Sequence, residues 1–186
     1  MPRRIGVFCG SQAGNDGRYI DTAIHTASSI VARGWGIVYG GGRVGLMGVL
    51  ADTALAAGGE VIGVIPAALS AKEIAHDGLT ELHVVESMHE RKALMADLSD
   101  AFVALPGGYG TMDEFCEILT WAQLRIHDKP VGLLNSSGYY DDLIALFDKM
   151  VREGFVTARN RMLVRSSESI DELLDSLISP AYRRPF

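Results

Sequence analysis

Short apolar runs alternate along the chain with longer stretches in which apolar and polar residues are mixed at helical spacing. Each apolar run is followed by a glycine, a proline or an asparagine, as at the end of a buried strand. The runs predict five strands, over residues 5–9, 36–39, 61–65, 101–105 and 131–134. Strands that alternate with helices in this way favour a parallel sheet covered by helices on both faces.

Six of the remaining stretches have the length and periodicity of helices. In one of them Leu46, Leu50 and Ala54 recur on a single face. The last is expected to begin with a capping box, in which Ser169 and Glu172 each satisfy a backbone N–H group. The predicted helices cover residues 15–33, 44–57, 88–98, 112–126, 140–153 and 170–178. The expected fold is an open, doubly wound α/β sheet with helices on both faces.

The composition fits one domain over residues 1–186, because 186 residues that are 48% hydrophobic suffice for a single core. Its end, residues 179–186, is expected to be an irregular tail. No apolar run reaches the roughly 18 to 20 residues of a membrane helix, and the N-terminus lacks a secretory signal. We therefore expect a cytoplasmic protein with no membrane partner. Cys9 and Cys116 stand in no metal-like or redox spacing and are expected to be free, buried thiols.

The charge of the chain narrows the possible ligands. A net charge of −6 with scattered basic residues argues against nucleic acid as a partner. One small anion is still compatible, because a phosphate needs only a few backbone N–H groups and a nearby cation. The five histidines show no ligand spacing, so no metal site is expected.

Ligands of open α/β sheets bind outside the carboxyl ends of the strands, and four of the five loops there contain glycine. In the second loop Gly40, Gly42 and Gly45 fit the GxGxxG pattern of dinucleotide sites, but no acid follows the next strand to hold a ribose. The pattern therefore leaves three alternatives: an NAD or NADP site, a phosphate or ribose contact, or packing glycines. Candidate phosphate contacts in the first two loops are Ser11, Gly41 and Gly42.

The stretch LPGGYGTMDE, residues 105–114, follows the fourth predicted strand. Gly107, Gly108 and Gly110 would let the backbone approach a ligand, and Thr111 could donate to a phosphate oxygen. No GxxxxGK motif occurs, so triphosphate and magnesium chemistry is not indicated. A structural alternative is that Thr111 and Glu114 form only a helix-capping box.

Two cations upstream change the balance between these alternatives. Arg91 and Lys92 lie in the helix that precedes the same strand, although alone they could be a solvated helical face. Together with Glu114 and the glycine loop, they provide what a reaction on a phosphorylated sugar needs. The loop would bind phosphate, and the carboxylate and guanidinium would stabilise charge in the transition state.

With MHERK at 88–92 and PGGYGT followed two residues on by Glu114, the sequence closely resembles the LOG family, the cytokinin riboside 5′-monophosphate phosphoribohydrolases. The resemblance runs through VFCGS, YGGGRVGLMG, VIGVIP, LTWAQLRIHDKPVGLLN and GYYDDL, which is nearly the whole chain. It implies a Rossmann-like homodimer that hydrolyses the N-glycosidic bond of AMP or an N6-prenylated AMP and releases the base and ribose 5-phosphate. Older annotation of the family as lysine decarboxylases would require pyridoxal phosphate on a Schiff-base lysine, for which the sequence gives little support.

The resemblance also implies residue roles. Arg91 and Glu114 fall on the family's catalytic pair, and no cofactor is implied. At Asp113 many members have glutamate, a departure that bears on fine positioning. The substrate-contacting positions map to Glu73, Lys92, Gly107, Gly108, Tyr109, Gly110, Thr111 and Thr120.

The proposed chemistry agrees with these residue types. Cleavage of C1′–N9 builds positive charge on the ribose, which a carboxylate such as Glu114 can stabilise, or Glu114 can activate water. Arg91, permanently charged, would act electrostatically on the departing purine. Two alternatives remain: a nucleotide or molybdenum-cofactor carrier that needs the loops but not Glu114, and an NAD-dependent oxidoreductase.

Overall fold

The computed structural model describes residues 3–70 and 75–179 of the chain. Seven strands form one parallel sheet in the order β4-β3-β2-β1-β5-β6-β7. The strands are β1 Arg4–Phe8, β2 Gly36–Tyr39, β3 Val61–Pro66, β4 Glu81–Val85, β5 Ala101–Ala104, β6 Val131–Leu134 and β7 Val164–Ser167. This confirms the predicted doubly wound α/β class.

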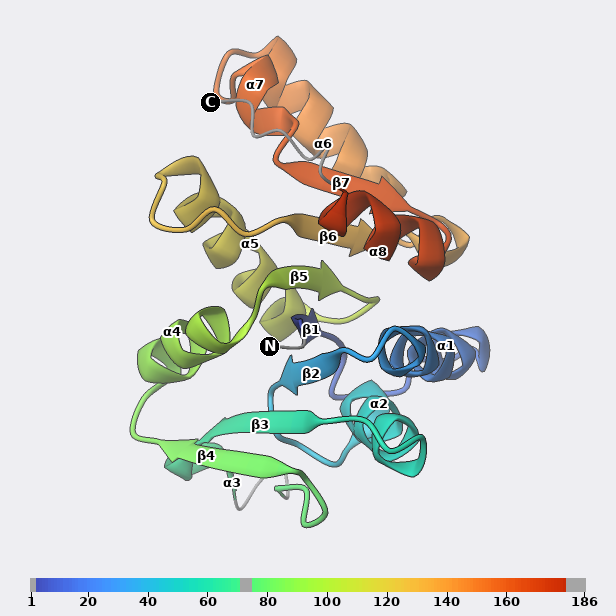
Figure 1. The fold of residues 1–186 in the computed structure, drawn as a ribbon. Helices are drawn as coiled ribbons and strands as arrows, with labels where there is room; N and C mark the ends of the chain where they lie inside the picture. Colours follow the sequence, from blue (N-terminus) through green and yellow to red (C-terminus); the bar gives the residue numbers. More distant parts are fainter. Residues whose placement is uncertain (1–2, 71–74, 180–186) are drawn as a thin grey trace.

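Helices cover both faces of the sheet (Figure 1). One face packs against α1, α2 and α8, and the other against α4, α5 and α6. The helices are α1 Arg18–Ala32, α2 Gly45–Ala56, α3 Ala67–Ser70, α4 Met88–Leu98, α5 Tyr109–Gln123, the 3-10 turn η1 Ser136–Gly138, α6 Asp141–Arg152, α7 Ala158–Arg161 and α8 Ile170–Ile178. Among the described residues, no helix is long and apolar enough to cross a bilayer.

The strand order reverses between β1 and β5. From β1 the chain winds outward through β2, β3 and β4, and from β5 it winds the other way through β6 and β7 (Figure 1). After β1 the chain continues into α1 on one face of the sheet, and after β5 it continues into α5 on the other, an arrangement that opens a crevice at the carboxyl ends of these two strands. This topology places the loop after Phe8 beside the loop after Ala104, whose Cα atoms are in register.

Two edge strands were not predicted from the sequence. β4 (ELHVV) and β7 (VRSS) contain polar residues because each has only one neighbouring strand and is partly open to solvent. The central strands, in contrast, are buried on both faces and read as continuous apolar runs. The apolar pattern thus identified the buried strands and missed the exposed ones.

The start of α8 shows a variant of the expected capping box. Ser169 Oγ accepts from the backbone N–H of Glu172 at 3.4 Å, as expected. The return contact runs through Ser167, whose Oγ donates to Glu172 Oε2 at 3.0 Å and accepts from Ser169 N at 3.1 Å. A third residue therefore completes a cap that the sequence assigned to two.

Candidate active site

The loops after β1 and β5 touch at the point where the strand order reverses. Gly10 N donates to the Pro106 carbonyl at 3.2 Å, and Gly10 O accepts from Leu46 N of α2 at 3.0 Å. A Cβ on Gly107 would lie 2.1 Å from Thr111 Oγ1 and 2.9 Å from the Gly10 nitrogen. Glycine is required at this position because the two loops and the first turn of α5 meet there.

The helix α5 begins three residues earlier than predicted, at Tyr109. Its N-cap is Gly108 in extended conformation, and no side chain caps it. Thr111 therefore lies within the first turn, so the alternative that Thr111 and Glu114 form a capping box is wrong. An uncapped helix N-terminus presents N–H groups and a positive dipole end, which is a favourable place for a phosphate.

Arg91 is buried at the carboxyl ends of β2 and β3, with 6% of its surface exposed. Its Nε donates to the Val64 carbonyl at 3.1 Å and its Nη2 to the Gly40 carbonyl at 3.4 Å. The same Nη2 lies 3.4 Å from Glu114 Oε1, and Glu114 is 8% exposed. Two backbone carbonyls thus fix the direction of a guanidinium that faces a buried carboxylate, and this partner offsets the cost of burying the charge.

Glycines of the GxGxxG pattern make room for this arrangement. A Cβ on Gly40 would lie 2.0 Å from Arg91 Nη2, and a Cβ on Gly45 would lie 2.3 Å from the Ser11 carbonyl carbon. Gly41 O accepts from His76 N at 3.0 Å, and Gly42 O accepts from the Tyr39 hydroxyl at 3.1 Å. Of the three alternatives for the pattern, the geometry favours packing glycines.

Two cavities open at this edge of the sheet and share Ser11 and Gly108. The smaller, of about 150 Å³, contains Arg91 and Glu114, and we call it the catalytic cavity. Its other lining residues are Cys9, Met47, Tyr109, Gly110 and Thr111.

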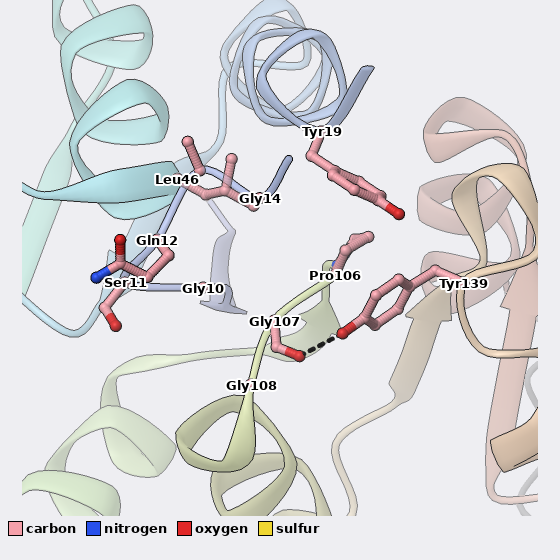
Figure 2. Close-up of a pocket in the computed structure, with 11 residues that line it drawn as sticks. Gly10, Ser11, Gln12, Gly14, Tyr19, Leu46, Pro106, Gly107, Gly108 and Tyr139 are labelled. Carbon is pink, nitrogen blue, oxygen red and sulfur yellow. Dashed lines mark hydrogen bonds between the residues drawn. The ribbon is translucent and has the colours of Figure 1, made fainter. Parts of the chain in front are cut away.

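The larger cavity, of about 260 Å³, lies between the loops after β1 and β5, and Tyr19, Leu46 and Tyr139 also line it (Figure 2). There the Tyr139 hydroxyl donates to the Gly107 carbonyl at 2.6 Å. Tyr19 packs against Tyr139 in an edge-to-face arrangement of the two rings. Neither tyrosine was identified from the sequence. The aromatic pair in GYYDDL, after the strand at 131–134, was the available signal.

Cys9 forms part of the catalytic cavity wall. Burial, and secondarily the charge of Glu114, raise the pKa of the Cys9 thiol well above its usual range, so the thiol stays neutral at physiological pH. Cys9 and Cys116 are both free, as predicted, but only Cys9 is buried. The expected burial of Cys116 is wrong, because it lies on the outer face of α5.

The other predicted contact residues are not all near the pair. Lys92 Nζ lies 3.1 Å from Asp113 Oδ2 and 2.8 Å from Glu117 Oε2, outside the catalytic cavity. The side chain of Thr120 lines a different cavity, between α5, α6 and α7, about 13 Å along the helix from Thr111. Glu73 lies outside the described residues. Tyr109 lines the catalytic cavity although 97% of its surface is exposed.

Metal and pyridoxal chemistry find no support in the described residues. In that part of the chain no group of three or more metal-ligating side chains gathers. Lys92 is held by two carboxylates, Lys129 Nζ donates to the Ala96 carbonyl, and Lys149 is an exposed residue of α6. None of these three lysines lines the catalytic cavity, where a Schiff base would have to form.

Fold and site together define a doubly wound α/β protein with a helix N-terminus open to an anion and a buried arginine–glutamate pair beside it. A family model described as possible lysine decarboxylase matches residues 47–177. A probable cytokinin riboside 5′-monophosphate phosphoribohydrolase of rice, Oryza sativa subsp. japonica, is 56% identical over 92% of this chain and 77% of its own. The chain belongs to this family, the LOG family, as the motifs predicted.

Further comparisons agree with the assignment. A cytokinin riboside 5′-monophosphate phosphoribohydrolase of Arabidopsis thaliana is 51% identical over 94% of this chain and 82% of its own. Among solved structures, the molybdenum cofactor binding protein of Rippkaea orientalis superposes with a TM-score of 0.71 at 25% identity, over 96% of this chain and 99% of that one. The fold is thus shared by hydrolases and by a cofactor-binding protein, so residues of the site must decide between them.

Proposed function

We propose that this protein hydrolyses the N-glycosidic bond of a purine nucleoside 5′-monophosphate, AMP or an N6-prenylated AMP, and releases the free base and ribose 5-phosphate. The observation that carries the proposal is the buried pair of Arg91 and Glu114, 3.4 Å apart, in a cavity that also contains the N-terminus of α5. The names of the relatives from rice and Arabidopsis support the same reaction.

The phosphate would bind at the shared wall of the two cavities. Gly108, Tyr109, Gly110 and Thr111 provide backbone N–H groups there, and Ser11 faces them from the loop after β1. The 5′-phosphate and C1′ of one ribose are only a few ångströms apart, so a phosphate at this wall would bring C1′ beside Glu114. The helix dipole and the absence of a capping side chain both favour an anion at this position.

In the proposed reaction a water oxygen bonds to C1′ as the C1′–N9 bond breaks. The bonding electrons leave with the purine, which takes up a proton while the attacking water loses one. Glu114 would stabilise the positive charge that develops on the ribose or accept the proton of the water. Arg91, fixed by the carbonyls of Gly40 and Val64, would stabilise negative charge on the departing base.

Two further parts of the proposal concern the setting of the reaction. Family resemblance supports a homodimer, in which Thr120, remote from the Arg91–Glu114 pair of its own chain, could contact the ligand of the neighbouring copy. We also infer a cytoplasmic location, where nucleoside monophosphates are found. No cofactor is needed, because hydrolysis transfers neither electrons nor a group other than to water.

Chromatographic detection of free base tests the proposal. Wild type and Glu114→Gln are incubated with AMP and with N6-isopentenyl-AMP, and binding of AMP is measured by calorimetry. We expect wild type to release base and Glu114→Gln to bind AMP within a few-fold of wild type but turn over at least about 100-fold more slowly. The control Glu153→Gln removes an exposed carboxylate at the end of α6 and should behave as wild type.

A carrier is the second candidate, favoured by the likeness to the molybdenum cofactor binding protein. A carrier would bind its ligand at the same loops without using Glu114. It predicts no release of base by folded wild type, which is the opposite of the hydrolase result, whereas binding by Glu114→Gln is retained in both cases. An NAD-dependent oxidoreductase is disfavoured, because Gly40 and Gly45 accommodate Arg91 and Ser11 and Glu60 is paired with Arg4 at the far end of β3.

A further inference from the structure

The two consecutive cations of α4 meet α5 in different ways. The side chain of Arg91 lies at the carboxyl ends of β2 and β3 and faces Glu114. The side chain of Lys92 lies against α5 between Asp113 and Glu117. These two carboxylates are four residues apart, so they stand one above the other on the same face of the helix. Lys92 therefore contacts α5 at two points that bracket Glu114.

This environment is unfavourable for a phosphate at Lys92. Its side chain is only 10% exposed, and its Nζ already faces two carboxylates at 3.1 and 2.8 Å. Burial lowers the pKa of Lys92, but its contacts with the carboxylates of Glu117 and Asp113 outweigh this, so the pKa is raised and the amine remains charged. One cation and two carboxylates leave the cluster net negative, so a further anion would be repelled.

The first turns of α5 have no side-chain cap to hold them, so contacts from other elements fix their position. The helix begins at an extended glycine without a side-chain cap, and Gly110 lies in its first turn. Glycine at this place adds backbone freedom, and the missing cap leaves the end free to fray. One ion pair would restrain only a distance, whereas two contacts on an i, i+4 pair restrain both the rotation of α5 and its sliding along α4.

We propose that Lys92 is a positioning residue rather than a ligand for the substrate phosphate: with Asp113 and Glu117 it holds α5 against α4 so that Glu114 faces Arg91. The inference rests on the proposed function, because it assigns a role in that reaction. It also gives a role to Asp113, where many family members have glutamate. The shorter carboxylate still reaches Lys92, at 3.1 Å.

Lys92→Met keeps the apolar stem and removes the charge, and it separates the two roles. Positioning predicts that kcat for base release falls about 10-fold or more, because a misplacement of 1 Å can cost about 100-fold. The KM for AMP and the inhibition constant of ribose 5-phosphate should change less than about threefold. A phosphate ligand would give the reverse result, with KM and the inhibition constant raised and kcat retained.

A charge exchange provides the sharper test. Lys92→Glu and Glu117→Lys should each lower kcat, but the double variant again has one cation beside two carboxylates, since the lysine at position 117 lies next to Asp113. We expect the double variant to recover at least tenfold in kcat over either single variant, and Lys92→Arg to stay near wild type. A double variant no more active than the singles would overturn the proposal.

Hydrogen exchange makes the test independent of turnover. Amides of residues 109–117 should exchange faster in Lys92→Met and return to the wild-type rate in the double variant, while calorimetry shows unchanged AMP binding. Wild type that releases no base would contradict the proposed function alone, and the anchoring of α5 would then be judged by exchange. Unchanged exchange in Lys92→Met would overturn the anchoring.

Discussion

The loop after β2 reads GGGRVG and the loop after β5 reads PGGYGT, and each connects a central strand to a helix. After β2 the start of α2 is occupied, because Leu46 N donates to Gly10 O and Gly45 packs on Ser11. Neither helix has a side-chain cap, but after β5 the start of α5 lines two cavities. A glycine loop before a helix is therefore a candidate anion site only where the helix start is open.

The largest effect should come from Gly45→Ala, in the loop that packs. Gly45 has φ of +58°, and a Cβ there would lie 2.3 Å from the backbone of Ser11. The free energy of unfolding should fall by about 3 kcal/mol or more, which lowers Tm by about 6 to 12 °C. Gly58→Ala is the matched control, with φ of +75° and open space around it, and should cost only about 1 kcal/mol. If thermal unfolding shows that Gly45→Ala and Gly58→Ala lose the same stability, Gly45 has no special packing role.

Gly40→Ala should separate activity from stability. The methyl group would displace the guanidinium of Arg91, whose Nη2 lies 2.0 Å from the added Cβ, and a flexible side chain can give way at small cost. We expect kcat to fall about 100-fold while the free energy of unfolding falls by about 1 kcal/mol. Steady-state kinetics and chemical denaturation on the same preparation measure both. Retained kcat would show that Arg91 does not need its present position.

Gly110→Ala changes the start of α5, after β5, where the cavities lie. Nothing lies within 4 Å of a Cβ at Gly110, and alanine in the first turn should raise stability by about 0.5 to 1 kcal/mol. The same methyl group would enter the catalytic cavity, so the Kd for AMP should rise about tenfold, or about 1.4 kcal/mol. Gly17→Ala, also with open space around it, should leave AMP binding unchanged. If Gly110→Ala binds AMP normally, the phosphate is not at this loop.

The sequence was sufficient for the class of fold and for the central pair. Buried parallel strands give continuous apolar runs, and Arg91 and Glu114 lie in motifs that mark them. The pairing of Lys92 with Asp113 and Glu117 could not be predicted, because it depends on how α4 and α5 are rotated about their own axes. Spacing shows which residues share a helical face but not which face meets a neighbour.

The packing roles of Gly40 and Gly107 could not be predicted from the sequence either. Gly40 and Gly107 are both explained by what a Cβ would strike, in one case a side chain from another helix and in the other a loop and the first turn of α5. Such contacts join residues far apart in the chain, so the GxGxxG pattern alone left three alternatives open. The start of α5 was placed three residues late for a related reason, since glycines in GGYG disfavour a helix that the surrounding packing imposes.

The smallest predicted effect concerns two neighbouring tyrosines at the open loop. The Tyr139 hydroxyl donates to Gly107 O and the Tyr140 hydroxyl to Leu105 O, both at 2.6 Å, but only Tyr139 lines a cavity at the site. Tyr139→Phe should loosen the loop and raise the KM for AMP about threefold to fivefold at constant kcat, as loss of about 1 kcal/mol implies.

Tyr140→Phe should do the opposite, because it leaves the buried Leu105 carbonyl without its hydroxyl donor. Its free energy of unfolding should fall by about 1 kcal/mol while the KM for AMP stays at the wild-type value. Steady-state kinetics and thermal unfolding of both variants, measured side by side, distinguish a role in AMP binding from a role in stability. A change in stability alone in both variants would mean that the loop around Gly107, like the loop of Gly40 and Gly45, serves packing and not binding, and the distinction between the two loops would fail.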